Sequence, residues 1–182
     1  MGTTSAENVR DLRYPIGRFE PPQTVTRKQR DAWIGDLERF PADLTRAVRD
    51  LNDAQLDTAY RPGGWTVRQL VHHLPDSHLN AYVRFRLALT EITPVIKPYD
   101  EAAWARLPDA NTAPIEPSLK LLESLHIRLT LLLRSMQDAD FARSFQHPEL
   151  GDVRLDRNLA LYSWHGLHHL AHITGLKERE GW

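Results

Sequence analysis

The sequence predicts an all-α protein built as a four-helix bundle. Its 182 residues are enough for one domain, and 41% of them are hydrophobic, an ordinary share for a globular core. Apolar residues recur every three or four positions in four long stretches, which is the pattern of amphipathic helices. No series of strands with alternating polarity competes with them. Four long amphipathic helices pack as a bundle around one core.

Charge and cysteine content narrow the function classes. The chain carries 23 basic and 24 acidic residues, a net charge of −1, so it has no long-range attraction to nucleic acid or to an anionic membrane. It has no cysteine, which excludes disulfides and thiolate metal ligands. Any metal would be bound by imidazole, carboxylate or water. No apolar run approaches the roughly 20 residues of a membrane span, and no signal peptide opens the chain, so we expect a cytoplasmic protein.

The chain begins with a predicted tail, residues 1–11, and continues as a single domain, residues 12–182. Pro and Gly make the segment up to residue 25 an irregular arm, and its aromatic residues are expected to pack on the body. The first helix begins near Thr26, an N-cap with Gln29 three residues later. Pro41 lies inside this helix and predicts a kink.

The second helix begins at its N-cap, Thr66, and continues to about Glu91, with a bend predicted at Pro75. A long connection, residues 93–117, follows and includes a short helix at 101–106. Connections of this length in a compact domain usually cover a site or contact a partner. The third helix covers about 117–137, and the fourth covers about 156–178. The loop between them, residues 138–155, is expected to contain a short hairpin.

The segment from Tyr162 to Ile173 carries four of the nine histidines of the chain. At about 100° per residue, all four imidazoles fall within an arc of about 100° on one side of the helix. Two pairs, His165 with His169 and His168 with His172, have the i, i+4 spacing that offers two nitrogens to one metal ion. Spacing alone does not choose between the two pairs.

A catalytic zinc site needs a third protein ligand and an open position for water. The second helix carries three candidates, which are His72, His73 and His78. Ligands on facing helices that converge in a bundle interior are a known route to such a site.

Two segments resemble the DinB-like superfamily. Residues 65–78 resemble its second-helix motif, in which Trp-Ser/Thr opens the helix and a ligand histidine follows eight residues after the Trp; that position is His73, with His72 as the alternate. Residues 164–173 resemble its final His-x-x-x-His, and the matching pair is His165 and His169.

The resemblance is closer still to one branch, the YfiT-like metal-dependent hydrolases, whose hydrolase name is itself inferred from the site. Four segments carry it, and the match covers nearly the whole chain from residue 12; these segments are residues 12–17, 60–65, 96–100 and 147–149. It implies a four-helix bundle, a homodimer, and one divalent ion, zinc or nickel, on His73, His165 and His169. Wider relatives are thiol S-transferases that use low-molecular-weight thiols such as bacillithiol or mycothiol.

We therefore expect a metal-dependent hydrolase that activates water for attack on a small-molecule substrate. One alternative is a metal-dependent thiol S-transferase that joins a thiol of the bacillithiol type to an electrophile. The other is a non-catalytic metal- or ligand-binding bundle, in which His168, His172 or Asp76 would close the site as a fourth ligand. No nucleic acid or membrane is expected as a partner.

The remaining histidines receive other roles. His168 and His172 are predicted to be neighbours of the site, His126 to be a hydrogen-bonded core residue, and His147 to be exposed. His78 is assigned to packing, with lining of the site as the alternative.

Three charged residues of the second helix are also candidates. Asp76 either orients a ligand imidazole or is exposed. Arg84 and Arg86 are expected to form a solvated basic face; the alternative is that they bind an anionic group of the substrate.

Overall fold

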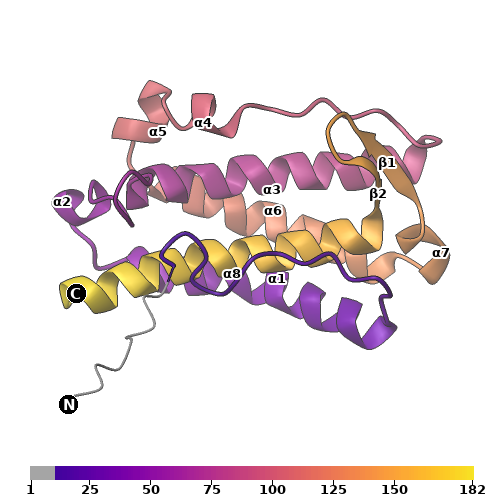
Figure 1. Cartoon of the computed structure of the whole chain (residues 1–182), viewed down its shortest axis with the longest axis horizontal. Coiled ribbons are helices and arrows are strands. Elements are labelled where there is room, and N and C mark those ends of the chain that lie inside the picture. Colours follow the sequence, from indigo (N-terminus) through magenta and orange to yellow (C-terminus); the bar gives the residue numbers. More distant parts are fainter. Residues whose placement is uncertain (1–10) are drawn as a thin grey trace, which may run out of the picture.

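Four long helices form the body of the molecule in a computed structural model that describes residues 11–182 (Figure 1). These helices are α1 (Arg27–Val48), α3 (Val67–Thr90), α6 (Glu116–Ser135) and α8 (Leu155–Glu180). Thr26 and Thr66 cap α1 and α3, and each forms a capping box with the glutamine three residues later. The predicted helices are confirmed to within a few residues, and α1 and α3 continue through Pro41 and Pro75.

The arrangement of the helices differs from a simple up-and-down bundle. Both α1 and α3 pack against α6 and α8, so the first and second long helices lie diagonally across the bundle. In an up-and-down bundle, helices that follow each other in the chain would be neighbours. This arrangement puts α3 beside α8, which brings together the two helices that carry the histidine motifs.

Short elements fill the connections. Two of them, α2 (Asp53–Leu56) and α5 (Pro108–Thr112), were not predicted from the sequence. The predicted long connection between α3 and α6 is present; it contains α4 (Glu101–Trp104) and α5 and follows the length of α3 (Figure 1). After α7 (Asp138–Phe141), the predicted hairpin is formed by β1 (Ser144–His147) and β2 (Gly151–Arg154), with Ser144 paired to Arg154.

The arm before α1 packs on the body, as predicted. The ring of Phe19 lies 5.8 Å from that of Trp164, and the Tyr14 ring lies 6.2 Å from that of His168. The predicted tail lies outside the described residues, apart from Asp11. No helix within residues 11–182 combines the length and apolar character needed to cross a membrane.

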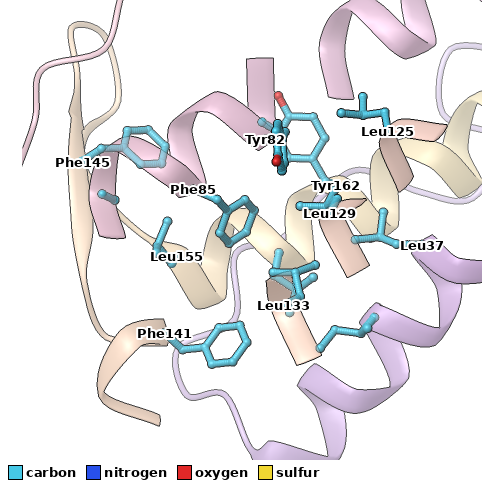
Figure 2. Close-up of a cluster of buried hydrophobic side chains, with 14 of the residues drawn as sticks. Leu37, Tyr82, Phe85, Leu125, Leu129, Leu133, Phe141, Phe145, Leu155 and Tyr162 are labelled. Carbon is cyan, nitrogen blue, oxygen red and sulfur yellow. The ribbon is translucent and has the colours of Figure 1, made fainter. Parts of the chain in front are cut away.

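Two separate hydrophobic clusters form the core. One lies toward the hairpin and includes Leu37, Phe85 and Tyr162 (Figure 2). The other includes Phe40 and Leu74. Along the helices the histidines lie at the boundary between the two clusters, so a polar layer crosses the bundle there.

Candidate metal centre

Three imidazoles from two neighbouring helices meet in this layer. His73 comes from α3, and His165 and His169 come from successive turns of α8. One ring nitrogen from each lies within 4.8 Å of the others. The Nε2 atoms of His73 and His165 are 3.3 Å apart. Two nitrogens bound tetrahedrally to zinc at about 2.0–2.1 Å would be about 3.3–3.4 Å apart, so this pair already has the required spacing.

The charge state of the three rings suits metal binding. Burial lowers the pKa of His73 to about 4. It also lowers the pKa values of His165 and His169 well below their ordinary value, with smaller contributions from neighbouring histidines. Metal-binding histidines must be neutral, and all three are neutral at pH 7. The buried Nδ1 of His169 has no hydrogen-bond partner within residues 11–182. The donor set therefore fits a divalent ion.

His73 and its neighbour His72 point in different directions. The Nδ1 of His72 hydrogen bonds to Ser118 Oγ at 2.7 Å, and its Nε2 lies 3.3 Å from the carbonyl oxygen of Ala113. These contacts commit both of its nitrogens to α6 and the preceding connection. His73 instead lies beside the Trp65 ring, with a centroid distance of 4.8 Å. Of the three candidates on α3, only His73 joins the triad.

The remaining two histidines of the α8 motif form a second group with His169. The Nε2 atoms of His168 and His172 are 3.0 Å apart, and nitrogens of His168, His169 and His172 also lie within 4.8 Å of one another. Trp164 stacks on His168 at 4.4 Å, and Tyr60 covers His172 at 4.1 Å. This second triad comes from one helix only and shares His169 with the first.

The first triad opens into a cavity of about 720 Å³. No fourth histidine or carboxylate joins the three rings within residues 11–182. The cavity is lined by α3, α8, the hairpin and the connection between α3 and α6, so that connection does cover a site. Arginines and acidic residues both line it; these are Arg61, Arg84, Asp100, Glu101 and Glu149.

Several cavity residues could not be assigned from the sequence. Ser77, Tyr99 and Tyr162 line the cavity, and burial raises the pKa of both tyrosines, so both phenols are protonated donors at neutral pH. Arg84, predicted to be solvated, instead lines the cavity and lies 3.5 Å from the Tyr162 hydroxyl. The only signal for Tyr162 was its place one turn before His165 on the same helix.

Of the predictions for two histidines outside the triad, the one for His147 is wrong and the one for His126 is confirmed. His147 lines the cavity and is only partly exposed, so its predicted exposure was wrong; the hairpin folds over the cavity and covers it. Its Nδ1 accepts a hydrogen bond from the Glu149 backbone N–H at 3.2 Å. His126 is 1% exposed and hydrogen-bonded, as predicted for a core histidine.

The other charged candidates on α3 are not members of the triad. Arg86 is exposed, as predicted. No imidazole within residues 11–182 hydrogen bonds to the carboxylate of Asp76, and that carboxylate is neither exposed nor a member of either triad. Burial, followed by the nearby charge of Asp109, raises the pKa of Asp76 to about 6.

Comparison with known families decides what kind of protein carries this centre. A family model described as the DinB superfamily matches residues 36–173. The chain belongs to the DinB superfamily. The match includes α3 and α8 as far as Ile173, so all three imidazoles lie inside the DinB region.

Among DinB proteins, the chain is similar to relatives from Bacillus. It is 53% identical over 174 residues to a protein of Bacillus mycoides, covering 96% of this chain and 100% of the relative. It is also 53% identical to YfiT of Bacillus subtilis over 173 residues, covering 94% and 97% of the two chains. The names of both relatives class them provisionally as metal-dependent hydrolases. The resemblance predicted from the sequence is confirmed.

Solved structures confirm the fold. The structure of Bacillus subtilis YfiT, described as having an unusual four-helix bundle topology, superposes with a TM-score of 0.92 and covers 94% of this chain and 98% of that chain. TT2238, described as a four-helix bundle protein, is 20% identical, has a TM-score of 0.57 and covers 80% of this chain and 98% of its own. TT2238 supports the fold alone.

Proposed function

We propose that this DinB protein is a metal-dependent enzyme whose ion is held by His73, His165 and His169 and faces the cavity. One observation carries the proposal: three neutral imidazoles from two helices converge at a cavity of about 720 Å³ without a fourth ligand group within residues 11–182. A structural zinc site is normally closed by four protein ligands, whereas a catalytic site keeps one position open.

Hydrolysis is the first reaction we propose. When bound, a divalent ion would supply a Lewis acid that polarises a carbonyl and makes a water molecule or a thiol more acidic. Three neutral imidazoles add no negative charge, so they leave the full positive charge of the ion to act on the substrate. The phenol of Tyr162, which stays protonated, and the guanidinium of Arg84 can donate hydrogen bonds to a substrate oxygen in the cavity.

Thiol transfer is the second candidate, and the charges of the cavity favour it. Arg61 and Arg84 lie in the same cavity as three carboxylates, which suits a small substrate with both amine and carboxylate groups. Low-molecular-weight thiols built from amino acids have this character. The choice of zinc or nickel, and a homodimeric assembly, remain part of the proposal and rest on the family resemblance.

A paired activity screen tests the enzyme proposal. Purified protein saturated with zinc, and separately with nickel, would be assayed against ester and amide substrates and against cysteine-containing thiols with an electrophile. We expect metal-dependent turnover in one of the two panels and none in metal-free protein or in H165A. If the metal-saturated wild type retains stoichiometric metal but turns over no substrate of either panel, the enzyme proposal fails. That result would favour a non-catalytic metal-binding bundle.

A further inference from the structure

A chain of hydrogen bonds crosses the bundle core behind the candidate metal centre. The Nδ1 of His126 lies 2.7 Å from the carbonyl oxygen of Leu37, and its Nε2 lies 2.9 Å from the Nδ1 of His78. The Nε2 of His78 lies 3.2 Å from the Nδ1 of His165. Each long helix contributes one group: α1 the carbonyl, α6 His126, α3 His78 and α8 His165. The chain therefore ends on a ligand of the proposed ion.

Pro41 explains why the Leu37 carbonyl is available. In an α-helix, the carbonyl of residue 37 would accept from the N–H of residue 41. Residue 41 is a proline inside α1 and has no N–H, so this carbonyl lacks its helical donor. An imidazole N–H of His126 takes that place. A proline that looks unfavourable within α1 thus leaves an acceptor pointing into the core.

The Leu37 carbonyl determines which ring nitrogen is the donor in each of these hydrogen bonds. A carbonyl oxygen only accepts, so the Nδ1 of His126 carries the proton and its Nε2 accepts. The Nδ1 of His78 must then donate to His126, which leaves the Nε2 of His78 as an acceptor. The Nδ1 of His165 donates to that nitrogen. The remaining nitrogen of His165, Nε2, is left with a free lone pair, and it is the one 3.3 Å from His73.

This assignment requires neutral rings, and their surroundings favour neutrality. His78 is 0% exposed and His126 is 1% exposed. Phe40 stacks on His78 at 5.6 Å, and no carboxylate within residues 11–182 hydrogen bonds to either ring. Burial lowers the pKa of His78 well below its ordinary value and that of His126 to about 4. A charge in this layer would be buried without a partner, which is costly.

We propose that His78 and His126 are positioning residues that hold His165 as the Nδ1–H tautomer and aim its Nε2 at the metal. Metal-binding histidines usually donate their second N–H directly to a carboxylate or a carbonyl. Here two further imidazoles, His126 and His78, connect His165 to a main-chain carbonyl of α1. The inference rests on the proposed function, because it takes His165 as a ligand.

Substitutions at His126 test the relay without touching a ligand. In H126L, His78 loses its acceptor and no longer has a fixed tautomer, so we expect the zinc dissociation constant to rise by about ten- to one-hundred-fold. In H126Q, the amide can accept from His78 and donate to Leu37, so we expect recovery to within a few-fold of wild type. The control is H72Q, because His72 lies on the same helix as His78 but takes no part in these hydrogen bonds. H72Q should bind zinc as the wild type does. Competition with a chromophoric chelator measures all three.

The tautomer of His165 is a second measurement. It would not change if His126 only contributed to packing. Long-range proton–nitrogen NMR of the metal-free wild type should show His78, His126 and His165 protonated at Nδ1, and H126L should shift His165 toward Nε2–H. An Nε2–H tautomer at His165 in the wild type would overturn the inference, as would unchanged zinc affinity in folded H126L. The wild-type spectrum needs no variant to fold. If the wild type binds no zinc at all, the proposed function fails, while the spectrum still decides the proton positions.

Discussion

The adjacent residues His72 and His73 show how one position along a helix separates a ligand candidate from a packing residue. Pro75 follows closely and made the helical wheel of this segment unreliable, so the residues alone left both candidates open. Packing separates them: Ser118 and Ala113 occupy both nitrogens of His72, while His73 faces His165. The motif of the family, with its fixed distance from Trp65, selected the same residue.

Asp76 gives a residue-scale prediction about pH. Its pKa is about 6 in the folded protein, against 3.8 when unperturbed, because burial disfavours the charged form. The folded state therefore binds more protons between these values, and the free energy of unfolding falls as pH rises from about 4 to about 6. Above pH 6 the penalty is constant. The variant D76N removes it.

We expect D76N to raise the free energy of unfolding by about 1 kcal/mol at pH 7.5 and to have little effect at pH 4, with the full shift discounted because the carboxyl is half-buried. Urea unfolding at both pH values measures this. An equal effect at the two pH values would show that the ionised carboxylate is not what destabilises the fold.

The histidines of the triad could be predicted from the sequence as single residues. The residues that line the cavity around them could not. The i, i+4 pairs on α8 follow from helical periodicity, and the family motif identified His73. Tyr99 and His147 come from a connection and a hairpin, and periodicity does not determine how such segments fold back over a bundle. The role of Pro41 was also hidden, because the sequence shows a missing N–H but not which group takes the free carbonyl.

Gly166 controls how closely α8 approaches α1. A Cβ at this position would lie 3.2 Å from three atoms of the Phe40 ring. Phe40 is 2% exposed and packs against His78 and His126, so it has little room to move. The close approach of the two helices therefore favours glycine next to the ligand candidate His165.

A pair of glycine substitutions tests this contact between elements. Replacing glycine by alanine inside a helix ordinarily stabilises by about 0.5–1 kcal/mol. We expect that gain for G175A, whose new Cβ would have only the flexible Arg179 guanidinium nearby, at 3.5 Å. We expect G166A instead to lose about 1 kcal/mol or more through overpacking. Urea unfolding measures the free energy of unfolding of both variants. Equal increases would show that the Phe40 ring moves to accommodate the new Cβ and that the contact between α8 and α1 is not tight.

The starts of the long helices followed from local signals, but the short helix α2 was missed. The capping boxes at Thr26 and Thr66 mark the starts of α1 and α3, because each pairs a cap residue with a glutamine three positions later. The four-residue helix α2 has the same kind of box at Asn52. It has too few residues for an apolar period to emerge, so no helix was predicted there.

The whole molecule brings the site together from segments far apart in the chain. Two hydrophobic clusters stabilise the bundle on either side of a layer of histidines, and the diagonal placement of α1 and α3 lets α3 contact α8. Helix periodicity predicted a bundle but carries no information on which helices are neighbours. The resemblance implied one contact only, between the second and fourth long helices, because it placed ligands from both on one ion.

The central claim is that the metal is held by the triad shared between α3 and α8. His169 belongs to both histidine triads, so only His73 and His165 distinguish this triad from the one formed by His168 and His172. The decisive measurement is zinc content and affinity of H73A and H165A beside the matched variant H172A, a buried histidine of the same α8 motif. We expect H73A and H165A to lose stoichiometric zinc and H172A to retain it. Loss of zinc in H172A with retention in H73A and H165A would contradict the account.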